Sequence, residues 1–72
     1  MKVTIEYCEP CGYYPRAQAA GARLRDGSGA EVALVKGRGG VFEIAIDGAL
    51  KFSKKATGRF PTDAELDALA RG

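Results

Sequence analysis

The chain has 72 residues, of which 46% are hydrophobic, and its formal net charge is only +2. A chain of this length buries only about 60% of its unfolded surface, so we expect one domain with one core over residues 1–72. The charge is too small to indicate a nucleic-acid partner by itself. The sequence has two cysteines and no histidine, which excludes histidine-based acid–base catalysis and Cys–His nucleophiles. Its chemistry must therefore use sulfur or carboxylate groups.

Nothing in the sequence indicates a membrane segment or a secretory leader. Charged residues occur within the first six positions, where a signal peptide would be apolar. No stretch of about eighteen consecutive apolar residues occurs either. We therefore expect a soluble, cytoplasmic protein with no membrane partner.

The first half of the chain predicts a strand, a helix and a second strand. Residues 2–7 alternate apolar and polar side chains at the period of a strand. Pro15 suits the first turn of a helix, and small or apolar residues recur at helical spacing as far as Leu24. Turn-forming residues at 26–29 end this helix, and residues 32–34 form a short apolar strand. This order implies two parallel strands joined by a right-handed crossover.

The second half predicts a hairpin and a final helix. Residues 42–46 and 50–52 alternate in polarity around Asp47 and Gly48, which supply the positive φ angles of a two-residue primed turn. Thr62 stands three residues before Glu65, which is the pattern of a capping box. The predicted order is β-α-β-β-β-α. The fold class is therefore α+β, with a four-stranded mixed sheet packed with two helices.

The sequence Cys8-Glu9-Pro10-Cys11 lies between the first strand and the first helix. This position holds two sulfurs within bonding distance, and the helix N-terminus favours the thiolate, which is the reactive form. Pro10 stiffens the loop, whereas Glu9 adds an opposing negative charge. A Cys-x-x-Cys motif next to a β-α-β pattern indicates redox use of Cys8 and Cys11.

The sequence leaves other uses of the two cysteines open. A purely structural disulfide would close so short a loop that it restricts the unfolded chain by only about 2 kcal/mol, and a cytoplasmic protein rarely keeps one oxidised. Two buried, inert thiols conflict with the turn-forming neighbours Glu9, Pro10 and Gly12. Binding of a soft metal such as copper or zinc is a further alternative.

Five segments of the chain resemble a known family when they are taken together and in order. They are VTIEYC at residues 3–8, CGY at 11–13, GVFEI at 40–44, SKK at 53–55 and GRFP at 58–61. On these segments the chain resembles the selenoprotein W group of the Rdx family, whose members share the SelT/SelW/SelH domain. The resemblance implies a thioredoxin-like fold and a thiol-based oxidoreductase role that is linked to glutathione or responsive to peroxide.

The resemblance also bears on the roles of the two cysteines. Selenoprotein members carry selenocysteine at the position of Cys11, which implies Cys11 as the attacking atom and Cys8 as the resolving thiol. The general order of thioredoxins is the reverse, so both residues remain candidates. Thioredoxins place a cis-proline opposite the motif, whereas residues 38–41 here contain no proline. The usual docking element of thioredoxins is therefore absent or replaced.

Three charged or glycine-rich segments have simpler explanations than catalysis. Basic residues crowd together near the end of the predicted hairpin and could dock carboxylates, although exposed charges usually do no more than face solvent; these are Lys51, Lys54, Lys55 and Arg59. The glycine-rich residues 36–40 lead into a strand, not a helix, so they do not form a phosphate loop. Asp63 and Glu65 fall in the first turn of a helix, where acidic residues favour helix formation.

These observations lead to one main hypothesis and two competing ones. The main hypothesis is a redox protein that cycles between a Cys8–Cys11 disulfide and a dithiol, with no bound cofactor. Its partners would be protein thiols and either glutathione or a thioredoxin-type reductant.

A copper-chaperone-like carrier normally has β-α-β-β-α-β order and a methionine before the first cysteine, whereas here Tyr7 precedes Cys8. The third hypothesis is a non-catalytic interaction module in which oxidation of the two cysteines controls binding to a partner. The exposed edges of so small a sheet also make a homodimer plausible.

Overall fold

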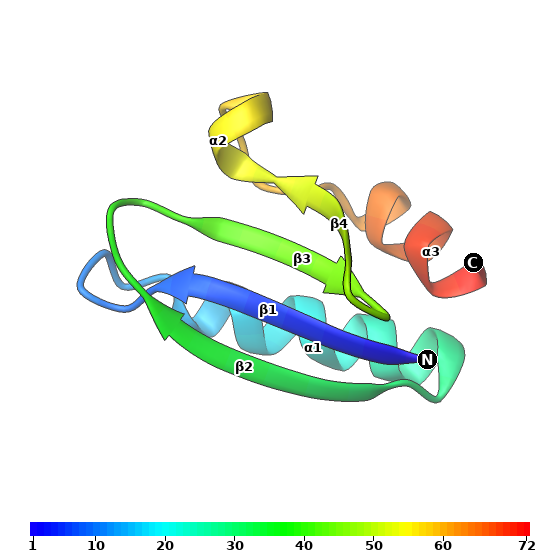
Figure 1. Ribbon diagram of the computed structural model, residues 1–72. Helices are drawn as coiled ribbons and strands as arrows, with labels where there is room; N and C mark the ends of the chain where they lie inside the picture. Colours follow the sequence, from blue (N-terminus) through cyan, green and yellow to red (C-terminus); the bar gives the residue numbers. More distant parts are fainter.

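Four strands form a single sheet in the computed structural model, which describes all residues from 1 to 72. Their order across the sheet is β2-β1-β3-β4 (Figure 1). The elements in chain order are β1 (Lys2–Cys8), α1 (Tyr14–Ser28), β2 (Glu31–Gly37), β3 (Phe42–Ile46), β4 (Ala49–Ser53), α2 (Lys54–Thr57) and α3 (Asp63–Arg71). The predicted α+β class and mixed four-stranded sheet are confirmed.

Strand pairing follows from the connections along the chain. Strands β1 and β2 are parallel and in register from Lys2 opposite Glu31 to Cys8 opposite Gly37, as their connection through α1 requires. Strand β3 runs antiparallel to both β1 and β4. Asp47 and Gly48 join β3 to β4 with φ angles of 51° and 85°, so the predicted primed turn is confirmed.

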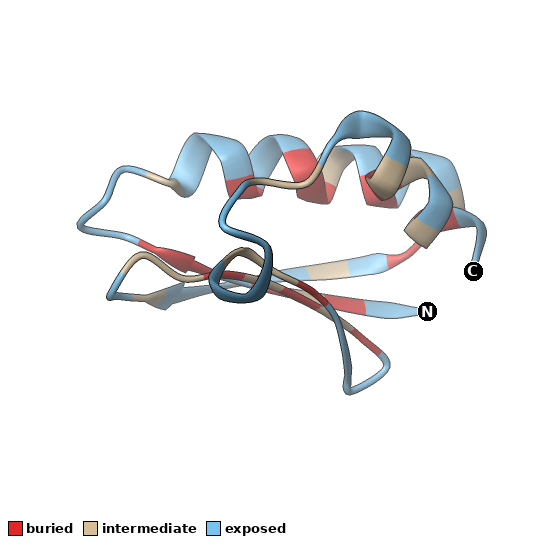
Figure 2. Ribbon diagram, turned by 90° about the horizontal axis from the view of Figure 1, so that it is seen from above, coloured by how far each residue is buried: buried red, intermediate tan, exposed pale blue.

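The core lies between one face of the sheet and the helices. Figure 2 shows α1 and α3 on the same face, while the opposite face of the sheet carries no helix. Alternate residues of β1 and β3 are buried beneath the helices, and α1 contributes a face of small residues and Leu24. A Cβ atom at Gly21 would lie 3.0 Å from Val32 Cγ1, so this glycine lets α1 approach the sheet closely. None of the helices is long and apolar enough to cross a membrane.

Two elements differ from the sequence-based prediction. Strand β2 continues to Gly37, beyond the predicted end at residue 34, because it pairs with β1 along its whole length. The short helix α2 follows β4 and was not predicted. The Ser53 hydroxyl caps it by accepting a hydrogen bond from the Ala56 N–H. Helix α2 buries no residue, so it left no apolar period in the sequence.

Helix α3 begins as predicted. The Thr62 hydroxyl accepts the Glu65 N–H at 3.1 Å, and the Glu65 carboxylate accepts the Thr62 N–H at 2.9 Å. This is a complete capping box. Helix α3 packs through Leu66 and Ala70, which are its buried residues. Asp63 and Glu65 therefore act at the start of a helix, as the sequence indicates.

Candidate functional site

The loop that carries the two cysteines is held to the sheet by backbone hydrogen bonds. The Cys8 N–H donates to the Val41 carbonyl at 2.8 Å, and the Glu9 N–H donates to the Gly37 carbonyl at 3.1 Å. The Gly12 N–H then closes a turn onto the Glu9 carbonyl at 3.1 Å. The loop is thus fixed at the end where β1 and β2 stop. The proline-free connection from β2 to β3 lies beside the motif and contains no cis peptide bond.

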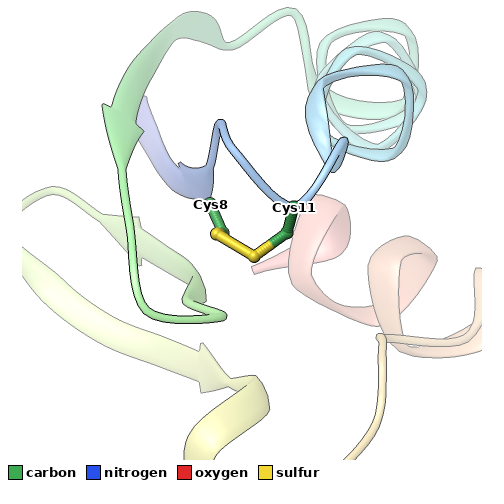
Figure 3. The surroundings of a disulfide bond; sticks show 2 residues. All are labelled: Cys8 and Cys11. Atoms are coloured by element: carbon green, nitrogen blue, oxygen red, sulfur yellow. A yellow bond between two sulfur atoms is a disulfide. The ribbon is translucent and has the colours of Figure 1, made fainter.

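Cys8 and Cys11 form a disulfide with an S–S distance of 2.06 Å and a Cα–Cα distance of 5.3 Å (Figure 3). Their environments differ strongly. Cys8, the last residue of β1, is 0% exposed, whereas Cys11 is an exposed residue of the loop. The structure therefore brings together both predicted site residues, of which Cys8 is buried and Cys11 is exposed.

The N-terminal end of α1 directly follows the cysteine loop. No side chain caps this end, and its first turn contains no acidic residue. Pro15 occupies the first turn, where its lack of an N–H costs no hydrogen bond. The partial positive charge of the helix end is therefore not neutralised from within the helix, and it favours a thiolate in the preceding loop.

A group of two aromatic rings and two cations adjoins the start of α1; we call it the aromatic–cation cluster, and it consists of Tyr13, Arg16, Lys54 and Phe60. The Tyr13 and Phe60 rings meet edge to face with centroids 4.8 Å apart. The Arg16 guanidinium lies 4.1 Å from the Phe60 centroid, and the Lys54 ammonium lies 5.4 Å from it. Cation–π attraction holds both charges on the ring face. Neither cation takes part in an ion pair.

The basic residues that the sequence groups together are separated by the fold. Only Lys54 reaches the aromatic–cation cluster. Arg59 forms a bidentate pair with Glu65, with distances of 2.6 and 2.9 Å, so the Glu65 carboxylate already balances its positive charge. Lys51 lines a separate pocket beside Met1, next to the turn between β3 and β4, and Lys55 is exposed.

Arg16 and Phe60 were not assigned a role from the sequence. Both also line a pocket of about 230 Å³ between α1 and the segment that enters α3. The segment GRFP at residues 58–61 contains Phe60, but nothing in the sequence shows that its ring would lie on Tyr13. Arg16 lies in the first turn of α1 with Pro15. This position close to the cysteine motif is the feature of the sequence that could have pointed to Arg16 as a site residue.

The acidic groups of this structure do not add a third ligand to the cysteine pair. No group of three or more histidine, cysteine, aspartate or glutamate side chains is arranged to hold a metal ion. Both cysteine sulfurs are instead bonded to each other.

The parallel β1-α1-β2 unit, the antiparallel β3–β4 hairpin and the disulfide at the end of β1 define a thioredoxin-like thiol protein. The model of the Rdx family matches residues 2–71. The chain therefore belongs to the Rdx family, as its resemblance to the selenoprotein W group indicates. Family membership together with the Cys8–Cys11 pair supports a redox role in general terms.

Solved structures of similar proteins agree with this assignment. A selenoprotein W-related protein from Vibrio cholerae is 29% identical, with a TM-score of 0.90 over 97% of this chain and 91% of that one. A protein from Bordetella parapertussis is 35% identical, with a TM-score of 0.88 over 97% of this chain and 92% of that one.

A relative matched by sequence is migration and invasion enhancer 1 from Bos taurus, which is 39% identical over 67 residues, or 92% of this chain. The chain spans 58% of that relative's length.

Proposed function

We propose that this protein is a thiol–disulfide oxidoreductase or redox sensor in which Cys11 is the attacking thiolate and Cys8 the resolving thiol. The observation that carries this proposal is the difference in exposure between the two bonded cysteine residues, because Cys8 is fully buried and Cys11 is exposed. Thiol–disulfide exchange needs in-line access to the sulfur that is attacked. The exposed residue Cys11 is therefore the better candidate for attack, in agreement with its position in the family motif.

Both directions of the proposed cycle consist of thiol–disulfide exchange reactions, each of which forms one S–S bond and breaks another. In the dithiol form, the Cys11 thiolate attacks one sulfur of a substrate disulfide, forms a mixed disulfide and releases the first substrate thiolate. The Cys8 thiolate then attacks the Cys11 sulfur, which releases the second substrate thiolate and restores the Cys8–Cys11 bond. Two reductant thiols reverse these steps. The first attacks the Cys11 sulfur and forms a mixed disulfide, and Cys8 leaves as thiolate. The second attacks the reductant sulfur of that mixed disulfide, which forms the reductant disulfide and releases Cys11 as thiolate.

We further propose protein disulfides as substrates and glutathione or a thioredoxin-type protein as the reductant, acting in the cytoplasm without a bound cofactor. Support for glutathione comes from the aromatic–cation cluster, because Arg16 and Lys54 carry unpaired positive charge next to the start of α1 and glutathione carries two carboxylates. Support for an extended protein segment comes from the exposed Tyr14 ring, which lies 5.6 Å from the Tyr7 ring at the same end of the sheet.

A redox titration of metal-free protein tests the proposal. The protein is equilibrated with glutathione or dithiothreitol buffers, alkylated and analysed by mass spectrometry, which reports the state of both cysteines. We expect one reversible two-electron transition at roughly −180 to −270 mV, the range of dithiol oxidoreductases. Absence of an intramolecular disulfide across that range would refute the redox cycle. A purified protein that carries stoichiometric copper or zinc would favour a metal carrier instead.

Serine variants separate the two cysteine roles. In Cys8→Ser the resolving thiol is lost, so we expect a glutathione mixed disulfide to accumulate on Cys11. Cys11→Ser is the matched control, because it keeps one thiol in the same loop but removes the accessible one. A stable adduct that forms only on Cys8 in Cys11→Ser would reverse the assignment. A working redox transition without turnover of any disulfide substrate would favour the redox-gated interaction module.

A further inference from the structure

The two edges of the sheet differ in how well they are protected from pairing with another strand. Strand β4 has only five residues, its pairing with β3 is interrupted by a register shift, and α2 follows it directly. These are features that prevent edge-to-edge association. Strand β2, at the other edge, has seven residues, pairs in unbroken register with β1 and contains the apolar run Val32–Val35. Its outer side has no neighbour in the sheet (Figure 1).

The hydrogen bonds at both ends of β2 show which backbone groups face outward. The Glu31 N–H donates to the Met1 carbonyl, and the Gly37 carbonyl accepts from the Glu9 N–H, both at 3.1 Å. Odd-numbered residues of β2 therefore turn their N–H and C=O groups toward β1. Because these groups alternate along a strand, the even-numbered residues Val32, Leu34 and Lys36 turn theirs toward the free edge.

We propose that β2 pairs antiparallel with β2 of a second copy of this chain, with Leu34 on the two-fold axis, which joins the two sheets into one. In this register Leu34 lies opposite Leu34, and Val32 lies opposite Lys36 of the second copy. Each of the three pairs exchanges two N–H···O bonds, so the edge gains about six backbone hydrogen bonds. A shift by two residues in either direction leaves about two such pairs. Only one register therefore satisfies every outward group.

The occupant is a second copy because the edge is complementary to itself. The outward groups are placed symmetrically about Leu34, as a two-fold axis requires. On the face without helices, Ala33 lies opposite Val35 of the second copy, so two apolar side chains meet, and Val35 is 44% exposed in the single chain. Glu31 and Lys36 lie opposite Gly37 and Val32, so no like charges face each other across the interface.

The dimer leaves the redox site accessible, so it can be tested separately from the proposed function. Cys8 is in register with Gly37 at one end of β2. In an antiparallel pair, the two disulfide sites therefore lie at opposite ends of the joined strands, away from the axis. Cysteine chemistry is expected to be the same in monomer and dimer.

Amide hydrogen exchange by NMR provides a test without substitutions. We expect exchange at Val32, Leu34 and Lys36 to slow by at least about tenfold between ~10 µM and ~1 mM protein, because association removes their N–H groups from water. The amides of Glu31, Ala33 and Val35 are bonded to β1 at all concentrations and serve as internal controls. Exchange at all three outward amides that stays as fast at ~1 mM as that of an amide open to water would overturn the proposal.

Charged variants test the register. Sedimentation velocity of the wild-type chain is expected to show a species of twice the 7.6 kDa chain mass at high concentration. The double variants Ala33→Glu/Val35→Glu and Ala33→Lys/Val35→Lys place like charges opposite each other twice, so each should associate at least about tenfold more weakly. An equimolar mixture should restore association, because opposite charges then meet.

The β4 edge supplies the matched control. Leu50 is 60% exposed on β4, so the variants Leu50→Glu and Leu50→Lys should leave association unchanged. Far-UV circular dichroism of every variant reports whether it is folded, and recovery in the mixture excludes misfolding as the cause of weak association. Wild-type protein that stays at one chain mass, or charged β2 variants that associate as wild type, would overturn the proposal.

Discussion

The difference in burial between the two cysteines predicts a large difference in their reactivity once the disulfide is reduced. Cys8 is 0% exposed, and its N–H is bonded to the Val41 carbonyl at the end of β1. An alkylating reagent therefore reaches Cys8 only when the end of the strand opens. A local opening of about 3 kcal/mol slows the reaction roughly a hundredfold. Cys11 needs no such opening.

Pulse alkylation followed by mass spectrometry measures this difference. Reduced protein is exposed to iodoacetamide for increasing times and then digested, so that the modified fraction of each cysteine is followed separately. We expect Cys11 to react roughly a hundredfold faster than Cys8 in the folded protein. In urea both sites should react at similar rates, which shows that the difference comes from the fold. Equal rates in the folded protein would refute the argument that burial assigns the two roles.

Three further predictions concern the elements that support the site. Phe60→Ala should lower the free energy of unfolding by about 2 kcal/mol in urea titrations, because its half-buried ring packs on two other rings and Arg16; an unchanged midpoint would contradict this role. The Arg59 guanidinium, followed by the N-cap backbone N–H, lowers the pKa of Glu65 from 4.5 to about 2, so this carboxylate stabilises the fold above pH 4.5 and the contribution is lost as the pH falls toward 2. Glu65→Gln should flatten the melting temperature across that pH window, and a slope equal to wild type would argue against the pair. Glu43 lies directly opposite Glu6 and has an Oε2 atom that is buried without a partner, so Glu43→Gln should raise stability by about 0.5 kcal/mol in the same titrations, whereas a loss would refute the repulsion.

Much of the fold could be predicted from local sequence patterns. The alternation in β1, the Asp47-Gly48 turn and the capping box at Thr62 each involve residues within a few positions of one another, and each is present in the structure. Such signals survive because the backbone geometry they require is local. Helix α2 was not predicted because it has four residues and buries none of them, so its sequence shows no helical spacing of apolar residues.

The sequence by itself determined the chemistry that is available to this protein: two cysteines with the spacing of a dithiol motif, placed between a strand and a helix, in a chain without histidine. The tertiary structure decided which cysteine is buried, which cations lie near the site and which sheet edge remains free. Arg16 and Phe60 come from distant parts of the chain and meet only when α1 and the segment before α3 pack on the same face of the sheet. Burial and such long-range contacts depend on the path of the whole chain, and no local pattern of residues encodes them.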